Sequence, residues 1–124
     1  MRHAELNPEG DFTNWDEDLL NELRQTELPL KLGNRLLFEN DRVRLWEIRL
    51  APQDKLPFRA FKNDYSWSCP TGGMVVERNG NGSIWFSQFE KEDKGFVDLK
   101  ESTQIKDIQN IGFENLRMHI LEYL

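Results

Sequence analysis

Alternation of hydrophobic and polar side chains dominates the chain from about residue 35 onward. In residues 43–51, Trp46, Ile48 and Leu50 occupy every second position, on the same side as Arg44. A period of two is typical of a β-strand with one buried face. Similar segments follow at short intervals, at 65–69, 73–78, 83–89, 95–99, 102–108 and 116–124. Many short strands joined by turns predict a β-sandwich or barrel.

The clearest turn signal is "NGNG", residues 79–82, which separates two of these segments. Asn and Gly tolerate positive φ, as two-residue hairpin turns require. The pattern therefore predicts a β-hairpin centred on residues 79–82.

A single segment near the N-terminus has helical spacing instead. Trp15, Leu19 and Leu23 recur every four residues, and Asn14 followed three residues later by a glutamate resembles a capping box. We predict a helix over 15–24. Its apolar side chains offer a surface for packing on its own barrel or on a second copy.

Length and charge bound the domain organisation and the partners. A chain of 124 residues suits one domain with a real core. We expect residues 1–12 to form a loose arm and 13–124 to form one domain that includes the helix. Sixteen Lys and Arg against 22 Asp and Glu give a net charge of −6, which disfavours nucleic acid or an anionic membrane as partner.

The sequence also favours a reducing compartment. It contains neither an apolar run of membrane-spanning length nor the apolar stretch of a signal peptide at its N-terminus. Cys69 is the only cysteine, so we expect no internal disulfide and no thiolate zinc cage. We therefore expect a cytoplasmic protein in which Cys69 is a small buried hydrophobe.

From about Leu37 to Leu124 the chain resembles the small single-domain cupins, which are double-stranded β-helix barrels. The stretch "ENDRVRLWEIRLAPQDKLPF" looks like the leading strands of bacterial small cupins, including those associated with β-alanine degradation. The resemblance implies a mainly β fold, a cupin-type barrel preceded by one helix. Small cupins commonly pair, so it also implies a homodimer.

The first cupin motif can be placed on the chain without gaps, but most of its side chains are replaced. Its opening glycine falls on Gln53, its two histidines on Arg59 and Phe61, and its glutamate on Tyr65. The closing glycine is retained as Gly72. The motif thus keeps one backbone position and loses its metal ligands.

The second motif is retained only at its ends. Gly95 and Asn110 match, whereas Glu101, Thr103 and Lys106 replace the proline, the inner glycine and the metal histidine. Ammonium, guanidinium and phenyl groups are not ligands for a divalent cation, and a neutral tyrosine is a poor one. We therefore expect no metal and no cofactor.

If the side chains in these slots point inward, as they do in cupins, the barrel contains a cationic and aromatic pocket. The predicted ligand-binding residues are Arg59, Phe61, Tyr65, Trp67, Lys106 and Trp46. Buried cations require counter-charges. Asp64, Glu77 or Glu101 could supply them from within the chain, or a ligand carboxylate or phosphate could do so.

Three classes of function fit these observations. The first, which we favour, is a metal-free, non-catalytic cupin that binds a small organic acid or a phosphate ester. The second is a metal-independent isomerase or epimerase with Tyr65 and Lys106 as acid and base. The third is a dimeric structural or interaction protein without a ligand. We assign no catalytic residue from the sequence.

Overall fold

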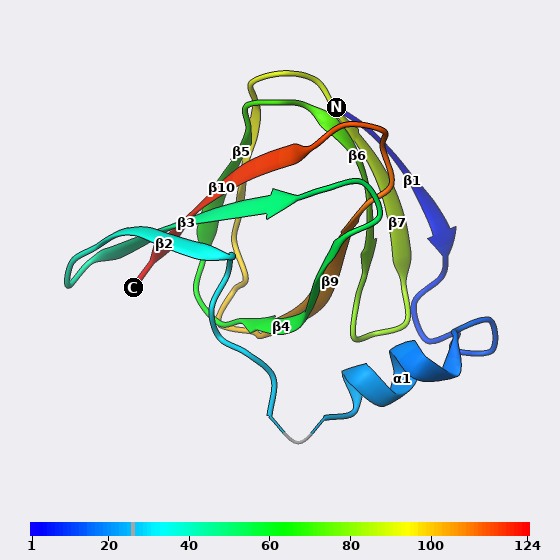
Figure 1. Cartoon of the computed structure of the whole chain (residues 1–124). Helices are drawn as coiled ribbons and strands as arrows, with labels where there is room; N and C mark the ends of the chain where they lie inside the picture. The colour runs from blue at the N-terminus through cyan, green and yellow to red at the C-terminus, as the bar shows by residue number, and fades with distance from the viewer. Residues whose placement is uncertain (26) are drawn as a thin grey trace.

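Two five-stranded antiparallel sheets face each other and enclose the core (Figure 1). The computed structural model describes residues 1–25 and 27–124. Sheet A has the strand order β1-β7-β6-β9-β4, and sheet B the order β2-β3-β10-β5-β8. The strands of sheet A are β1 (Arg2–Asn7), β4 (Lys55–Phe61), β6 (Gly73–Arg78), β7 (Ile84–Phe89) and β9 (Gln104–Asn110). Those of sheet B are β2 (Arg35–Glu39), β3 (Val43–Leu50), β5 (Tyr65–Cys69), β8 (Asp93–Val97) and β10 (Leu116–Tyr123). The prediction of a mainly β fold with one helix is confirmed.

The inward faces of the two sheets form one continuous hydrophobic core. Ile48 and Leu50 of β3 are buried in it, as the alternation in this segment predicts. Val75 of β6 and Ile108 of β9 meet them from sheet A, and Phe61 of β4 is fully buried. Because polar residues alternate with these positions in β3, this strand turns one face to the core.

The predicted hairpin is present at residues 79–82, between β6 and β7. The Asn79 N–H donates to the Ser83 carbonyl at 2.8 Å, and Gly82 has a φ of +99°. That conformation is strained for any residue with a Cβ, which explains the glycine at this position.

The expectation that residues 1–12 form a loose arm is wrong. Arg2–Asn7 form β1, an edge strand of sheet A. This strand pairs antiparallel with β7. Its side chains are exposed except for Asn7, so no hydrophobic alternation marks it. Backbone hydrogen bonds, which leave no trace in side-chain patterning, hold it on the sheet.

Helix α1 (Glu17–Leu23) is shorter than predicted and has a different cap. Asp16 is the N-cap residue and accepts from the Asp18 N–H at 2.8 Å, so the proposed capping box at Asn14 does not form. Trp15 precedes the helix and is buried against the barrel, where it stacks on Phe58 with ring centroids 5.9 Å apart. None of the helices in the described part of the chain is long and apolar enough to cross a membrane.

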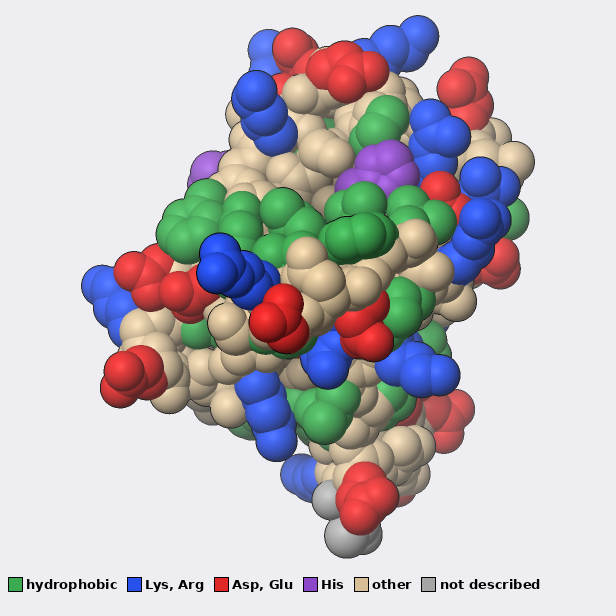
Figure 2. All heavy atoms as spheres, turned by 90° about the vertical axis from the view of Figure 1, so that its left-hand side faces the viewer, with side chains coloured by type: hydrophobic (Ala, Val, Ile, Leu, Met, Phe, Trp, Pro, Cys, Tyr) green, Lys and Arg blue, Asp and Glu red, His purple; other side chains and the backbone are tan. Residues whose placement is uncertain are grey.

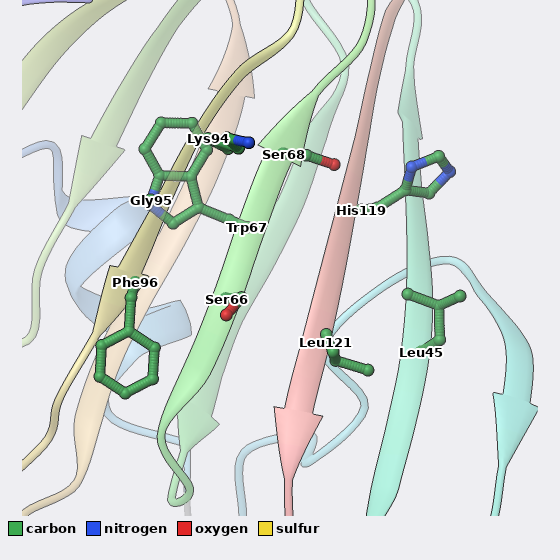
Figure 3. A pocket seen from close by; sticks show the side chains of 9 residues that line it. All are labelled: Leu45, Ser66, Trp67, Ser68, Lys94, Gly95, Phe96, His119 and Leu121. Carbon is green, nitrogen blue, oxygen red and sulfur yellow. The ribbon is translucent and has the colours of Figure 1, made fainter.

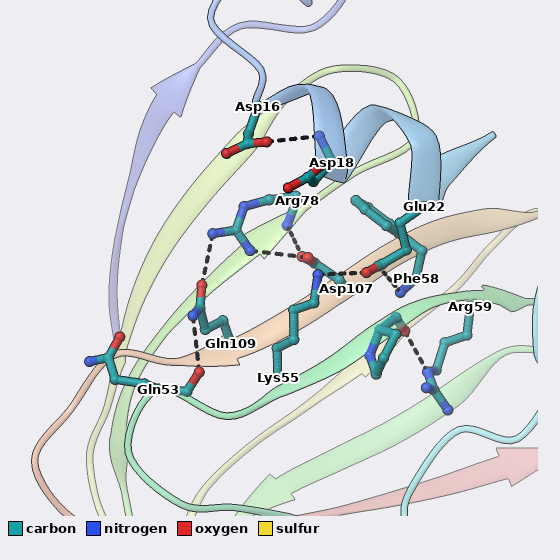
Figure 4. A network of polar contacts seen from close by, with 11 residues as sticks. Asp16, Asp18, Glu22, Gln53, Lys55, Phe58, Arg59, Arg78, Asp107 and Gln109 are labelled. Atoms are coloured by element: carbon teal, nitrogen blue, oxygen red, sulfur yellow. Dashed lines mark hydrogen bonds and ion pairs between the residues drawn. The ribbon is translucent and has the colours of Figure 1, made fainter. Parts of the chain in front are cut away.

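Polar contacts fix α1 to the outer face of sheet A (Figure 4). The Glu22 carboxylate accepts from Lys55 Nζ at 2.6 Å and from the Phe58 N–H at 3.0 Å. Beside them, Arg78 donates to the fully buried Asp107 carboxylate at 3.0 Å. Burial raises the pKa of Asp107, against the opposing effect of the Arg78 charge.

Candidate functional site

The barrel interior contains a cavity of about 170 Å³ with one polar and one apolar wall. Sheet A supplies the polar side chains, which are Glu77, Ser87, Gln104 and Lys106. Sheet B supplies aromatic and aliphatic side chains, which are Tyr65, Trp67, Val97, Met118 and Ile120. Met1, Phe89 and Ile108 complete the lining. A site of this form suits a small ligand with a polar edge and an apolar face.

Lys106 is the charged centre of this cavity. Its ammonium pairs with the Glu77 carboxylate at 2.5 Å, and the two side chains are 11% and 19% exposed. It also lies 5.2 Å from the centroid of the Phe61 ring and 5.7 Å from that of Tyr65. Burial is the largest single effect on Lys106 and lowers its pKa, but the Glu77 charge together with Tyr65 and the hydrogen bonds to both outweighs it, so the pKa is raised. The ammonium is therefore protonated at neutral pH.

Tyr65 and Gln104 form the second polar contact of the cavity. The Tyr65 hydroxyl donates to Gln104 Oε1 at 2.7 Å, while the Tyr65 ring packs against Phe61 with centroids 5.0 Å apart. Tyr65 is only 1% exposed. Its hydroxyl thus fixes the Gln104 amide, whose N–H groups remain as donors at the cavity wall.

Trp67 forms the flat part of the apolar wall, and Gly95 makes room for it. A Cβ at Gly95 would lie 2.6 Å from Trp67 Nε1, so a side chain at this position would displace the indole. Trp67 packs against Phe89 with ring centroids 5.0 Å apart. The glycine that matches the second cupin motif therefore has a direct role in shaping the cavity.

An open groove of about 690 Å³ lies at the barrel end that carries Leu23 of α1 and the β6–β7 turn (Figure 1). It shares Val97 and Gln104 with the cavity as lining residues. Trp85 provides an aromatic surface in the groove, among Asn, Ser and Thr side chains. Gln104 therefore borders both hollows.

Four of the six predicted ligand-binding residues come together at this site. Tyr65, Trp67 and Lys106 line the cavity, and Phe61 lies beneath the Lys106 ammonium. Trp46 does not join them: it is buried in the core, and its indole N–H donates to Glu122 Oε1 at 3.0 Å.

The Arg59 guanidinium does not line the cavity either. It donates to the Pro57 carbonyl at 2.9 Å and to the Lys31 carbonyl at 2.6 Å. Arg59 lies opposite Lys106 in the pairing of β4 with β9, but its guanidinium is held by these two carbonyls and does not line the cavity. Burial lowers the pKa of Arg59, partly offset by the charge of Glu22. The expected pair of cations in one pocket is therefore replaced by a single cation, Lys106.

Glu77 was one of three counter-charges that the sequence suggested, and it is the one that pairs with Lys106. Asp64 instead accepts from the Leu99 N–H at 2.8 Å, and Glu101 is exposed. Sequence reasoning missed Gln104 and Ser87. The period of two could have identified them. Gln104 lies two residues before Lys106, and Ser87 lies two residues after Trp85, which is opposite Glu77.

The residues at the four positions where the cupin motifs have metal ligands do not suit a divalent metal ion. These residues are Arg59, Phe61, Tyr65 and Lys106. Lys106 places an ammonium in the cavity, Phe61 offers no donor atom, and Arg59 is bound to backbone carbonyls. In residues 1–25 and 27–124, no group of three or more His, Cys, Asp and Glu side chains could hold a metal. The backbone of the motif is nevertheless kept, since Gln53 has a φ of +73° where the motif has glycine.

Comparison with known proteins identifies the architecture. No protein-family model matches the sequence, and no curated protein matches it significantly. A cupin domain from Bordetella pertussis Tohama I superposes with a TM-score of 0.65 at 17% identity, covering 81% of this chain and 99% of that one.

Two further structures agree with this likeness. A protein with a double-stranded β-helix domain from Klebsiella pneumoniae has a TM-score of 0.58 at 13% identity, with 85% of each chain covered. The polyketide cyclase RemF from Streptomyces resistomycificus has a TM-score of 0.52 at 12% identity and covers 72% of this chain and 62% of that one. The predicted architecture is thus confirmed: the chain is a small domain with the cupin fold, a double-stranded β-helix.

Proposed function

We propose that this protein is a metal-free cupin-fold binder of a small organic acid, held in the barrel cavity beside Lys106. The observation that carries the proposal is the division of the cavity into a polar wall around Lys106 and an apolar wall around Trp67. An ammonium carries more N–H donors than the Glu77 carboxylate oxygen can accept. The Gln104 amide adds further donors, so a ligand with acceptor oxygens fits this wall.

The charges favour a monocarboxylate over a phosphate ester. Arg59, which would have added a second positive charge, is bonded to backbone carbonyls outside the cavity. Lys106 is already matched by Glu77. A phosphate dianion would therefore enter the cavity without the positive charge needed to compensate its desolvation. A single carboxylate with an apolar body requires less compensation and can pack against Trp67.

The alternative of a metal-independent isomerase with Lys106 as base is less well supported. The pKa of Lys106 is raised by Glu77, so its ammonium does not release a proton readily at neutral pH. Tyr65 is engaged as a donor to Gln104. These groups can orient and polarise a bound acid, which is the behaviour of a binding site.

A panel of small monocarboxylates tests this proposal, with the matched primary amides and phosphate esters as comparison ligands. Binding is measured by thermal shift and then by calorimetry on the wild type, Lys106→Met and Lys62→Met. Lys62 is an exposed lysine just beyond β4 and serves as the control. A charge-assisted hydrogen bond contributes about 1.5–3 kcal/mol, so Lys106→Met should weaken carboxylate binding about tenfold to a hundredfold.

The amides should bind more weakly than the acids, and Lys62→Met should bind like the wild type. The proposal is wrong if no carboxylate stabilises the wild type. It is also wrong if the best ligand binds Lys106→Met as tightly as it binds the wild type.

A further inference from the structure

The outer face of sheet B carries a mostly apolar row of side chains that crosses all five strands. Residues directly opposite each other on paired strands place their side chains on the same face of a sheet. In sheet order, one residue from each strand, the apolar row consists of Phe38, Leu45, Leu121, Ser66 and Phe96. The neighbouring side chains of Trp46 and Ile120 are buried in the core, so the apolar row points outward. Phe38 and Phe96, at its two ends, are 53% and 59% exposed.

Two rows of charged and polar side chains, the basic rows, lie beside the apolar row on the same face. The nearer row, two residues further along β3, consists of Arg35, Glu47, His119, Ser68 and Lys94. The next row places Arg49 opposite Arg117. All four cations are exposed, whereas Glu47 is buried. The basic rows thus hold four cations and one carboxylate, in a chain whose net charge is −6.

The chain supplies few counter-charges to these cations. Glu47 Oε1 lies 2.7 Å from Arg49 Nε. In residues 1–25 and 27–124, no carboxylate lies within ion-pair distance of Arg35, Lys94 or Arg117. Like charges directly opposite each other, such as Arg49 and Arg117, destabilise paired strands. An acidic group from outside the chain would relieve this repulsion.

A shallow hollow of about 440 Å³ joins the apolar row to the basic rows (Figure 3). Its lining from the apolar row is Leu45, Ser66, Leu121 and Phe96, and its lining from the basic rows is Ser68, Lys94 and His119. Figure 2 shows hydrophobic side chains in a band across this side of the molecule, with charged side chains on both sides of the band. An apolar group in the hollow therefore lies beside the ammonium of Lys94.

We propose that this face binds an acidic peptide segment of another protein. A large apolar side chain of the segment fills the hollow, and its Asp or Glu side chains pair with Lys94 and the arginines of the basic rows. The apolar row and the nearer basic row are two residues apart along the strands, which is about 7 Å. In an extended segment, an apolar residue and an acidic residue two positions later have the same spacing on the same side. Complementary charge of this kind selects the partner and speeds its association.

The charges argue against a second copy of this chain packed on the same face. Among the described strands of sheet B, the only acidic side chain on this face is Glu47, which already pairs with Arg49. Two such faces packed together would leave the cations of both copies without counter-charges. The net charge of −6 likewise disfavours an anionic bilayer as the partner.

The proposal is independent of the ligand in the barrel. Among the described residues, Trp67 alone lines both the hollow and the barrel cavity. The charged and apolar side chains that carry the proposal lie on the outer face, so they can be replaced without changing the cavity lining.

Peptides selected from a random phage-displayed library on the full wild-type chain test the proposal. Each selected peptide is synthesised with a fluorescent label, and fluorescence polarisation gives its Kd. Lys94→Glu reverses a charge of the basic rows, and Phe96→Ser removes an apolar side chain of the hollow. Lys62→Glu and Phe113→Ser are the matched controls, because both residues are exposed and neither lines the hollow. Circular dichroism establishes that each variant is folded.

The selected peptides should be enriched in Asp and Glu close to Phe or Leu, and added salt should weaken their binding. Lys94→Glu should weaken binding about tenfold to a hundredfold, because it sets a carboxylate against the acidic peptide. Phe96→Ser should have an effect of about the same size, because it removes buried apolar area. Both controls should bind like the wild type.

Three results would overturn the proposal. The first is a selection that yields no acidic peptide, or peptides whose binding neither Lys94→Glu nor Phe96→Ser weakens. The second is a wild-type dimer in sedimentation equilibrium that Phe96→Ser dissociates, because a second copy would then occupy the face. The third is binding to phosphatidylserine vesicles that Lys94→Glu abolishes, because the face would then bind a membrane.

Discussion

Replacement of Glu77 by glutamine would leave the Lys106 ammonium in the barrel without a counter-charge. The two side chains are 11% and 19% exposed and 2.5 Å apart, and the other groups around the ammonium include the Phe61 and Tyr65 rings. Removing one partner of a buried ion pair costs about 3–5 kcal/mol. Residual exposure and the two rings compensate part of this loss. We expect Glu77→Gln to lower the free energy of unfolding by about 2–4 kcal/mol, out of a total of about 5–15 kcal/mol.

A double-mutant cycle separates the ion pair from simple packing. Lys106→Met removes the cation but retains most of the side-chain volume, and it leaves Glu77 with partial access to water. The double variant Glu77→Gln/Lys106→Met should therefore be more stable than Glu77→Gln alone, with a coupling energy above about 1.5 kcal/mol. Urea unfolding followed by tryptophan fluorescence measures each variant, and exposed Glu101→Gln is the control. Strictly additive effects, or a Glu77→Gln midpoint equal to that of the wild type, would refute the reasoning.

Three further predictions concern pH, reactivity and the helix. The pKa of Lys106 is higher in the folded than in the unfolded state, so the charged ammonium stabilises the fold. This contribution to the free energy of unfolding is complete below the ordinary lysine pKa of about 10.4 and is lost as pH rises through the folded-state pKa. Lys106→Met should not show this loss of unfolding free energy at alkaline pH. Cys69 is fully buried and burial raises the pKa of its thiol, so mass spectrometry should detect iodoacetamide modification at pH 8 only after urea is added. Glu22→Ala leaves the Phe58 N–H and Lys55 without their acceptor, and thermal unfolding should show a loss of about 1–3 kcal/mol that the exposed control Glu9→Ala does not show.

Much of the fold could be predicted because most strands bury one face, and burial imposes a period of two on the sequence. Trp46, Ile48 and Leu50 show this in β3, and the turn at 79–82 was identified by its Asn and Gly residues. Strand β1 was not predicted, because its side chains are exposed along almost its whole length and so show no alternation. The helix cap was misplaced because Trp15, which has helical spacing, is buried on the barrel before the helix begins.

The candidate site was predictable where a residue keeps the side-chain direction of its motif position. Tyr65 and Lys106 do so, and Trp67 lies two residues after Tyr65 on the same face of β5; all three line the cavity. Arg59 lies opposite Lys106 in the pairing of β4 with β9 but does not line the cavity, because its guanidinium donates to the Lys31 carbonyl, a contact between segments far apart in sequence. Likewise, the choice of Glu77 as the counter-charge depends on the pairing of β6 beside β9, which no local pattern contains.

The two ion pairs of sheet A also specify how β6 aligns with β9. Glu77 and Arg78 are consecutive, as are Lys106 and Asp107, so one pair lies inside the barrel and the other, with reversed polarity, on the outer face. The observed register extends from Val75 opposite Asn110 to the Asn79–Lys106 bridge, which places Arg78 opposite Asp107. Sliding β9 by one residue in one direction would set Glu77 against Asp107 and Arg78 against Lys106, two like-charged contacts at once. These four charges therefore act during folding as well as in the finished barrel, because they penalise a misaligned pairing that hydrogen bonding alone would tolerate.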